Sequence, residues 1–364
     1  MGRETRMRIL WLTHRDSLHP LRGGAERTVF EVSRRLARRG HEVIWFSVAP
    51  PNSKAEDEHE GIRLLRVRGN LAAHFAIPWV ISEVRPDAMV QDLAHVVPWL
   101  PDRFSAHPGT AFFHHLHART LSGQVRNLDA MILRFVESKY AWTFRNWPFV
   151  TESWQSAHDL EMLGIPPDRV RRIPPGVDLE MFRPRKKSPV PTLFYFAGFR
   201  NYKRPWIALE VLKLVLRDHK DARLVFAGDG PYLERVRSLV HEPLKSKVVF
   251  LGRVPDADLA ARLAEAWIHL YTSSSEGWGV CTLEAAAAGT PTVAFSVPGL
   301  RESVAPGVSG ELAPDNDVQT MGTICSSILS QPAAISSRCR AYAGGFTWER
   351  AAVEWERHLT HLQG

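Results

Sequence analysis

The chain has 364 residues, of which 45% are hydrophobic and 23% are charged, and its formal net charge at pH 7 is +7. This length exceeds what one hydrophobic core usually supports, so we expect a globular protein of two domains. No apolar run is long enough to span a membrane, and the first one, Ile9 to Leu12, is too short for a signal peptide, so we expect a cytoplasmic protein. The three cysteines lack metal-ligand spacing and cannot all pair, which suits a reducing compartment.

The positive charge indicates an anionic partner. Arginines interleaved with acidic residues carry much of this charge, and no lysine-rich tail or nucleic-acid motif is present. We therefore expect no nucleic acid as a partner, and favour a phosphorylated substrate or an anionic membrane surface.

The first half of the chain begins with a buried strand over 8–13. A loop over 14–24 closes with Gly23-Gly24-Ala25-Glu26, a helix follows over 27–39, and the next strand covers 41–48. This α/β unit lacks the Gly-x-Gly-x-x-Gly fingerprint, so nicotinamide and flavin cofactors are disfavoured. The paired glycines either let the backbone approach a ligand closely or simply form a tight turn.

Further strands are predicted over 62–67, 88–91 and 110–117, and the last of these ends in several histidines. These histidines would lie at the carboxyl edge of the sheet, as Gly24 does. His114 and His117 form a conceivable metal pair, but no carboxylate or cysteine follows at ligand spacing, so we expect no metal. The segment 118–147 is rich in Arg, Trp and Phe; it is interpreted as packed helix or, alternatively, as a surface that touches lipid or a lipid-linked acceptor.

A strand over 149–153 and a helix through Leu163 complete the first half, and the proline- and lysine-rich segment 182–191 is typical of a linker. The second half opens with a strand over 192–197, a loop that contains Arg200 and Lys203, and a helix. Basic side chains at such a junction can grip a diphosphate, although solvated loop charges are the alternative. The remaining predicted elements are strands over 223–227, 247–252 and 290–295 and a last helix over 346–362 with Thr347 as N-cap.

The most informative stretch runs from Ser273 to Gly289, after an apolar run over 266–271 and before an alanine-rich helix. A strand, a glycine-bearing loop and a helix in this order place a helix N-terminus at the carboxyl edge of a parallel sheet, where phosphates bind. Glu276 and Glu284 flank this anion site. Carboxylates accept hydrogen bonds from paired hydroxyls, so the pair predicts a nucleotide sugar, although exposed loop and helix charges are the alternative.

The sequence Glu276-Gly-Trp-Gly with Glu284 resembles the Glu-Gly-Phe-Gly-x-x-x-x-Glu signature of the retaining family 4 glycosyltransferases, with Trp278 in place of Phe. The Gly-Gly-x-Glu loop, Gly228-Asp-Gly-Pro and Ser309 to Pro314 resemble further segments of this family. The resemblance covers nearly the whole chain from Met7. It implies the GT-B fold, which consists of two Rossmann-like α/β domains with doubly wound parallel sheets and a cleft between them.

The resemblance also implies roles for individual residues. Lys203 and Arg200 would hold the donor diphosphate together with the backbone N–H groups of Gly279, Val280 and Cys281. Glu276 would bind hydroxyls of the donor sugar and Glu284 those of the ribose, and His114, or its rival His115, would lie close to the donor sugar. The other expected donor-site residues are Gly277 and Trp278, Gly23 and Gly24 facing the phosphates and the acceptor, and Arg253 and Val254 at the base.

We therefore predict an acceptor-binding domain over 1–183, a nucleotide-sugar-binding domain over 184–345 and a C-terminal helix over 346–364 that crosses back to the first domain. The predicted activity is metal-independent, cofactor-free transfer of a sugar from a UDP- or GDP-sugar to an acceptor hydroxyl with retention of configuration. The acceptor would be a sugar, a lipid-linked saccharide or a small molecule, and the enzyme would act in the cytoplasm or at the inner face of the membrane. The alternatives are a nucleotide-sugar epimerase of the same fold and a non-catalytic nucleotide-sugar-binding partner of a membrane enzyme.

Overall fold

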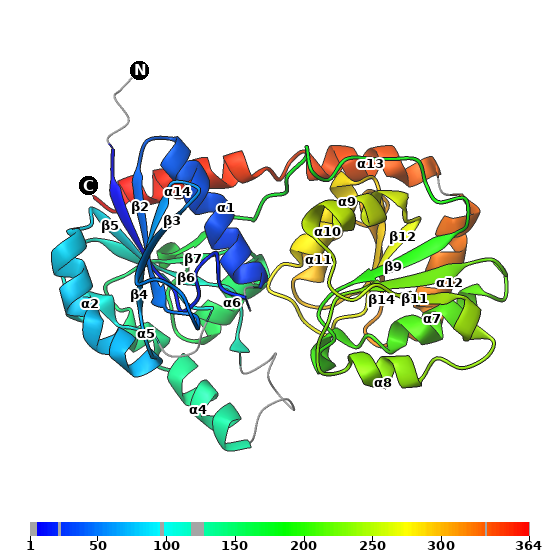
Figure 1. Ribbon diagram of the computed structural model, residues 1–364, viewed down its shortest axis with the longest axis horizontal. Helices are drawn as coiled ribbons and strands as arrows, with labels where there is room; N and C mark the ends of the chain where they lie inside the picture. The colour runs from blue at the N-terminus through cyan, green and yellow to red at the C-terminus, as the bar shows by residue number, and fades with distance from the viewer. Residues whose placement is uncertain (1–5, 21–22, 95–97, 118–126, 332, 364) are drawn as a thin grey trace. The chain divides into compact units, whose positions relative to one another are not determined.

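The computed structural model describes residues 6–20, 23–94, 98–117, 127–331 and 333–363. Two compact units are formed, one by 1–175 with 348–364 and one by 176–347. Each unit is a parallel sheet with helices on both faces (Figure 1). Phe182, inside the expected linker, is fully buried in the core of the second unit, so the chain leaves the first unit before that segment.

The first unit contains eight strands in the order β3-β4-β2-β1-β5-β6-β7-β8. All pairs are parallel except β3 with β4, and β3 was not predicted from the sequence. Its strands are β1 Arg8–Leu12, β2 Glu42–Val48, β3 Glu56–His59, β4 Ile62–Val67, β5 Ala88–Asp92, β6 Gly109–Phe113, β7 Phe149–Thr151 and β8 Val170–Arg172. Its helices are α1 Gly24–Arg38, α2 Asn70–Val84, α4 Asn127–Glu137, α5 Tyr140–Thr143, α6 Trp154–Met162 and α14 Trp348–His361.

Successive side chains along each strand point to opposite faces of the sheet, so the first unit has one core layer on each face. Leu10 and Leu12 of β1 belong to a cluster that includes Ile77 of α2 and Tyr140 of α5. Trp11 points to the opposite face, where its ring lies 5.1 Å from that of Trp355 in α14. Thus α2 and α5 cover one face of the sheet, and α14 packs with α1 on the other.

The second unit has six parallel strands in the order β11-β10-β9-β12-β13-β14. They are β9 Thr192–Phe196, β10 Arg223–Ala227, β11 Val248–Phe250, β12 Ile268–Tyr271, β13 Thr292–Phe295 and β14 Gly310–Ala313. The helices are α7 Ile207–Val215, α8 Leu233–Ser238, α9 Asp256–Glu265, α10 Val280–Ala287, α11 Leu300–Ser303, α12 Val318–Ser330 and α13 Ala333–Ala343. The core on one face includes α7 and α12, and that on the other includes α9, α10 and α13.

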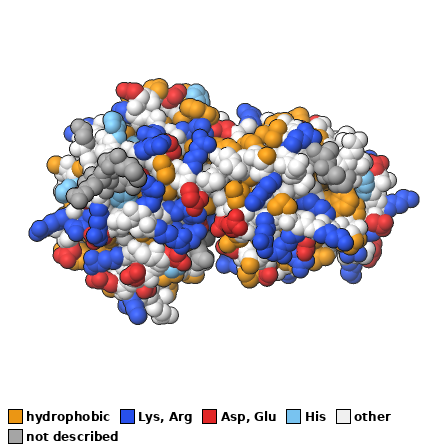
Figure 2. All heavy atoms as spheres, turned by 90° about the horizontal axis from the view of Figure 1, so that it is seen from above, with side chains coloured by type: hydrophobic (Ala, Val, Ile, Leu, Met, Phe, Trp, Pro, Cys, Tyr) orange, Lys and Arg blue, Asp and Glu red, His pale blue; other side chains and the backbone are white. Residues whose placement is uncertain are grey.

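The sequence predicted most strands within one or two residues. The strand predicted over 110–117 is too long, since β6 ends at Phe113 and His114 lies beyond it. The short strands β3, β8 and β14 were not predicted. The Arg-, Trp- and Phe-rich segment is described only from residue 127 onward, where α4 and α5 form; the part over 118–126 lies outside the described residues. On the face drawn in Figure 2, Lys and Arg side chains are interspersed with Asp and Glu rather than gathered in one patch.

Candidate active site

The loops that follow β9, β10, β11 and β12 meet at one edge of the second sheet because these strands are parallel and adjacent. The loop after β9 contains Arg200 and the short 3-10 helix Asn201–Lys203. The loop after β12 contains Glu276 and leads to α10. Residues that are about 75 positions apart in the sequence are therefore brought together at this edge.

Lys203 and Glu276 form the central contact of this edge. The Lys203 Nζ atom lies 2.5 Å from Glu276 Oε1 and donates a hydrogen bond of 2.9 Å to the Tyr271 hydroxyl. The two charged side chains are only 12% and 11% exposed. Burial alone would lower the pKa of Lys203, but the Glu276 carboxylate outweighs burial, and this pKa lies above its ordinary value. The ammonium group is therefore a permanent positive charge.

Arg204 ties the loop after β9 to the loop after β12. Its Nε donates to the Thr272 carbonyl oxygen at 2.8 Å and its Nη2 to the Ser273 carbonyl oxygen at 2.9 Å. In return, Thr272 Oγ1 donates to the Lys203 carbonyl oxygen at 2.8 Å. These bonds fix the position of Lys203 relative to Glu276, a bracing role for Arg204 that sequence reasoning missed because it depends on carbonyl groups far along the chain.

Two glycines shape the entry to α10. Gly279 caps the helix with φ 93°, a conformation that other residues rarely adopt. Gly299, with φ 79°, packs so closely against the loop that a Cβ atom there would collide with the Glu276 carbonyl group. The Glu276 N–H donates to the Pro298 carbonyl oxygen at 3.1 Å. Gly299 thus helps to position Glu276, which no pattern near residue 299 indicates.

The other carboxylate of the expected pair, Glu284, lies in α10 and is 2% exposed. Trp278 is 3% exposed and its ring lies 5.8 Å from that of Phe346 in a hydrophobic cluster. Only the backbone of Trp278 is therefore placed to meet a ligand. Val280 and the half-buried Cys281 lie in the first turn of α10, and Gly277 lies in the loop before it.

The expected base and diphosphate contacts lie in the neighbouring loops. Arg200 is exposed, as is Arg253, whose Nε lies 3.4 Å from Asp229 Oδ2 in the loop after β10. Val254 packs against the cluster that contains Trp278. The loops after β10 and β11 are joined by a hydrogen bond of 2.7 Å from the Gly228 N–H to the Gly252 carbonyl oxygen.

In the first unit, Gly23 and Gly24 stand at the start of α1. The Gly23 N–H donates to Glu26 Oε2 at 2.7 Å, so the Glu26 side chain satisfies the N–H group of the N-cap residue. Glu26 is 4% exposed, and its Oε1 atom lies 3.8 Å from Arg15 Nη1. The Gly-Gly-x-Glu motif thus has a definite local role in beginning the helix.

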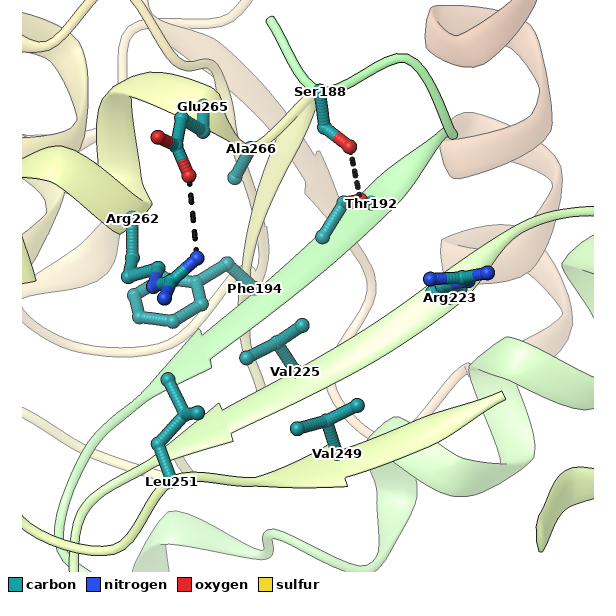
Figure 3. Close-up of a pocket in the computed structure, with 10 residues that line it drawn as sticks. All are labelled: Ser188, Thr192, Phe194, Arg223, Val225, Val249, Leu251, Arg262, Glu265 and Ala266. Atoms are coloured by element: carbon teal, nitrogen blue, oxygen red, sulfur yellow. Dashed lines mark hydrogen bonds and ion pairs between the residues drawn. The ribbon is translucent and has the colours of Figure 1, made fainter. Parts of the chain in front are cut away.

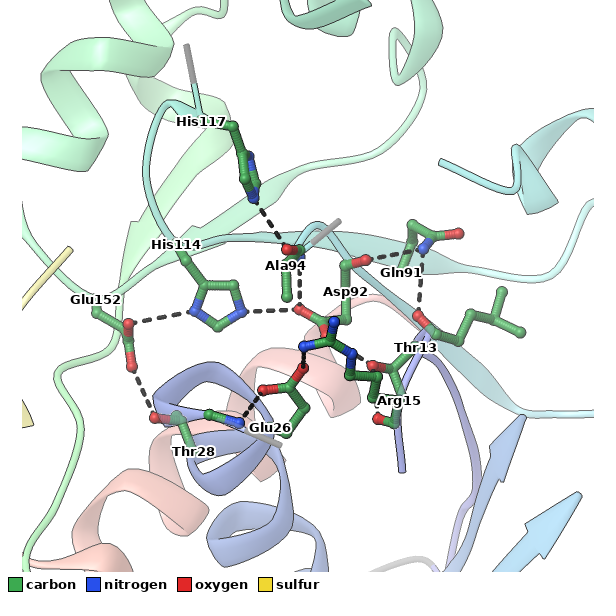
Figure 4. A network of polar contacts seen from close by, with 12 residues as sticks. Thr13, Arg15, Glu26, Thr28, Gln91, Asp92, Ala94, His114, His117 and Glu152 are labelled. Carbon is green, nitrogen blue, oxygen red and sulfur yellow. Dashed lines mark hydrogen bonds and ion pairs between the residues drawn. The ribbon is translucent and has the colours of Figure 1, made fainter. Parts of the chain in front are cut away.

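His114 lies at the same sheet edge as Gly24, between two carboxylates (Figure 4). Its Nε2 lies 2.8 Å from Asp92 Oδ1 and its Nδ1 3.4 Å from Glu152 Oε2. Burial alone would lower the pKa of His114, but the hydrogen bonds to Asp92 and Glu152 outweigh burial and raise it to about 10. His114 is therefore an imidazolium with both ring nitrogens engaged.

The partners of His114 are held in turn by other elements. Thr13 Oγ1 donates to Asp92 Oδ2 at 2.8 Å, and Thr28 Oγ1 donates to Glu152 Oε1 at 3.0 Å. We call His114, Asp92, Glu152, Thr13 and Thr28 the histidine network. It joins the ends of β1, β5, β6 and β7 to α1, and sequence reasoning named only its histidine.

The neighbouring histidines are differently placed. His115, the rival assignment, is half-buried, and its ring lies 5.0 Å from that of His117. The His117 backbone N–H donates to Glu137 Oε1 at 2.6 Å, and its Nε2 lies 2.9 Å from the Ala94 carbonyl oxygen. No group of three or more His, Cys, Asp or Glu side chains suited to a metal ion occurs among the described residues.

A pocket of about 260 Å³ also lies in the second unit, and neither Lys203 nor Glu276 lines it (Figure 3). It is lined by apolar side chains on the sheet, such as Phe194 and Val225, and by Thr192 and Arg223 at the amino ends of β9 and β10. Since Lys203 and Glu276 follow the carboxyl ends of the strands, this pocket is not part of the candidate active site.

Comparison with known families accounts for both units. Residues 22–181 match the model described as Glycosyltransferase Family 4, and residues 177–344 match the one described as Glycosyl transferases group 1. The chain belongs to the family 4 glycosyltransferases. It is therefore a glycosyltransferase of a retaining family whose donors are nucleotide sugars, and this confirms the class predicted from the sequence.

Relatives and solved structures agree with this family. The chain is 26% identical over 375 residues to glycogen synthase from Mycobacterium tuberculosis, and the match covers 91% of this glycosyltransferase and 89% of the relative. Sucrose-phosphate synthase from Thermosynechococcus elongatus superposes with a TM-score of 0.83 at 22% identity, covering 98% and 99% of the two chains. HepE from Anabaena, solved in complex with UDP-glucose, has a TM-score of 0.76 at 18% identity, covering 98% and 100%. The predicted GT-B fold is thereby confirmed.

Proposed function

We propose that this glycosyltransferase uses a UDP- or GDP-sugar, bound by the second unit, to glycosylate a hydroxyl of an acceptor bound by the first unit. The observation that carries the proposal is the Lys203–Glu276 pair at the sheet edge beside the N-terminus of α10. A fixed cation beside the N-terminus of a helix suits a diphosphate. The UDP-glucose bound to HepE supports a donor of this kind.

Lys203 acts in this proposal on the leaving group. Its raised pKa keeps it protonated, so it stabilises negative charge and does not act as a base. Arg200 and the N–H groups of Gly279, Val280 and Cys281 share that task. As the bond between the sugar C1 and the β-phosphate oxygen breaks, the charge of the diphosphate grows and these groups stabilise it.

Glu276 binds hydroxyls of the donor sugar and Glu284 those of the ribose. Glu276 already accepts a hydrogen bond from the Lys203 ammonium group. One carboxylate would therefore contact both the donor sugar and the lysine that stabilises the leaving diphosphate. Gly277, Trp278, Arg253 and Val254 contribute backbone contacts to the sugar and the base. Gly23 and Gly24 face the phosphates and the acceptor through their backbone.

Transfer proceeds on the face of the sugar that the leaving group occupied. The acceptor oxygen bonds to C1, and its proton passes to an oxygen of the departing diphosphate, which accounts for retention without a second protein carboxylate. His114 supports this site from the sheet edge, because a direct contact with the sugar would require it to leave Asp92 or Glu152. We expect neither a metal nor an organic cofactor to take part.

The acceptor is a sugar, a lipid-linked saccharide or a small molecule of glycan, glycolipid or cell-envelope synthesis, and we place the enzyme in the cytoplasm or at the inner face of a membrane. The three cysteines are free thiols, which suits a reducing compartment. Among the described residues, no helix is both long and apolar enough to cross a membrane.

The test is a panel of UDP-, GDP-, ADP- and dTDP-sugars, assayed for release of the nucleoside diphosphate with EDTA present. We expect slow release from a UDP- or GDP-sugar by the wild type and strong loss of release in Glu284→Ala. Lys213→Ala serves as the control, because Lys213 is exposed and forms an ion pair with Glu210 on the surface of α7. Binding without release in the presence of candidate acceptors would favour a non-catalytic partner, and conversion of the donor sugar without transfer would favour an epimerase.

A further inference from the structure

Helix α2 carries large apolar side chains on its outer face as well as on its inner face. Its inner residues, among them Ala73 and Ile77, belong to the core. Its outer residues Leu71, Phe75 and Trp79 are 72%, 77% and 62% exposed, and their spacing of four places them in one stripe. Glu83 is the only residue of α2 with a formal charge. A helix of this composition is normally buried on all sides, so its outer face is suited to a non-aqueous contact.

Helices α4 and α5 extend this apolar surface. Tyr140 of α5 and Val136 of α4 pack into the same core cluster as Ile77, so all three helices contact the core on the same side of the sheet, and α4 extends beyond it (Figure 1). Eight of the fifteen large hydrophobic side chains exposed in the described part of the chain belong to these helices or, for Phe104, to the segment beside Arg103: Leu71, Phe75, Trp79, Phe104, Met131, Ile132, Phe135 and Trp142.

Cations accompany these apolar side chains. The Arg103 guanidinium lies 4.6 Å from the centre of the Trp142 ring, and Lys139 Nζ lies 5.1 Å from that of Phe135. Arg134 and Arg145 are exposed nearby in the sequence. Among the side chains described over 98–117 and 131–147, no carboxylate is exposed, since Glu137 is buried and Asp102 is half-buried. The exposed carboxylate of α2, Glu83, lies at the C-terminal end of its stripe, four residues after Trp79. We call the eight hydrophobic side chains and these four cations the α2–α5 surface.

We infer that the α2–α5 surface docks on a bilayer of anionic phospholipids. The aromatic and aliphatic side chains enter the boundary between headgroups and acyl chains, and the four cations meet the lipid phosphates. A second copy of the chain fits less well, because a two-fold interface would bring four cations against four cations. The sequence indicated lipid contact only for 118–147; the structure adds the stripe of α2, which has the most exposed aromatic residue.

This docking does not depend on the donor chemistry proposed above, so it is tested on the full chain without any nucleotide. The measurement is flotation with vesicles of phosphatidylcholine, alone or mixed equally with phosphatidylglycerol. Two double variants remove the two kinds of contact: Phe75→Gln with Trp79→Gln, and Arg134→Gln with Lys139→Gln. The matched control is Trp154→Gln with Met162→Gln on α6, where both residues are exposed, at 63% and 74%, and Trp154 lies under Arg172 as Trp142 lies under Arg103.

We expect the wild type to float with the anionic vesicles and to be released by salt. Each cation near an anionic surface contributes about fivefold to partitioning, so the Arg134/Lys139 variant should bind roughly 25-fold more weakly. The Phe75/Trp79 variant should bind at least about tenfold more weakly, because aromatic burial at the interface is lost. The control should bind like the wild type, and thermal unfolding should show that all variants remain folded.

Absence of flotation with anionic vesicles would overturn the inference. So would a control that loses as much binding as the Phe75/Trp79 variant. Light scattering after size-exclusion chromatography would measure the oligomeric state. A wild-type dimer that becomes monomeric in the Phe75/Trp79 variant, without vesicle binding, would show that the surface joins two copies of the chain instead.

Discussion

Two buried positive charges stand at the carboxyl edges of the two sheets, and they differ in what they have left to offer a ligand. Lys203 in the second unit contacts one carboxylate and one hydroxyl, and an ammonium group has three N–H donors. His114 in the first unit has two ring N–H groups, and both face carboxylates. Lys203 can therefore accept a further ligand without losing its partners, whereas His114 cannot. We therefore propose that Lys203 binds the ligand and that His114 supports the site.

Removal of the histidine should have the largest effect on stability. His114→Ala leaves Asp92 and Glu152 buried without their cation, which we expect to cost about 3–5 kcal/mol of unfolding free energy. Chemical denaturation would measure this loss. His115→Ala, at the half-buried neighbour, should change stability far less. A His114→Ala enzyme with wild-type stability but no activity would instead indicate direct contact with the substrate.

Removal of the lysine should act on catalysis. Lys203→Ala should lower kcat by about 10²- to 10³-fold, because a fixed charge that stabilises the leaving diphosphate is lost. Steady-state kinetics with the donor found in the nucleotide-sugar panel would test this, with Lys213→Ala unchanged. If KM rises while kcat stays the same, the lysine binds the donor but does not stabilise the transition state.

The histidine network also predicts a pH dependence of stability. The pKa of His114 is raised from 6.5 to about 10, so the folded state binds the extra proton between these values and the unfolded state does not. This contribution is complete below pH 6.5 and is lost as pH rises toward 10, by about 1.4 kcal/mol for each pH unit.

Comparison of the wild type with His114→Gln isolates this contribution. The difference is needed because Lys187, whose burial lowers its pKa to about 8, has the opposite effect above pH 8. Denaturation at pH 6.5, 7.5 and 8.5 should show a stability advantage of the wild type that shrinks with pH. An advantage that stays constant or grows would mean that His114 is neutral in the folded protein.

A smaller effect is expected at Gly299. Gly299→Ala combines an unfavourable positive φ with a collision against the Glu276 backbone, so it should displace Glu276 and cost about 1–3 kcal/mol in kcat/KM for the donor. Gly307→Ala is the matched control, since Gly307 has φ 71° but open space where the Cβ would lie. Equal losses in both variants would mean that backbone strain alone, and not the position of Glu276, is responsible.

The candidate site of the second unit could be predicted well because its motif residues are close together in the sequence. A contiguous motif over 273–289 and an apolar run before it were enough to place Glu276 and α10 at a sheet edge. Lys203 was predicted from its own strand–loop–helix junction. Its contact with Glu276 could not be predicted in detail, because it depends on the pairing of β9 with β12.

The features that sequence reasoning missed depend on distant partners or on weak periodicity. Asp92 and Glu152 lie far from His114 in the sequence, and only the strand order brings them to it. Helix α2 was missed because it is apolar on both faces and contains Pro78, so it lacks the alternation of polar and apolar residues that marks a surface helix. The short antiparallel strand β3 carries mostly charged residues and has no apolar period.

The central claim is that Lys203, at the edge formed by β9 and β12, binds the diphosphate of the donor. Calorimetric titration of UDP and of GDP, with EDTA present, tests it without knowledge of the sugar or the acceptor. We predict that the wild type binds one of the two, that Lys203→Ala weakens this binding roughly ten- to hundredfold, and that Lys213→Ala leaves it unchanged. Undiminished affinity in Lys203→Ala would contradict the account.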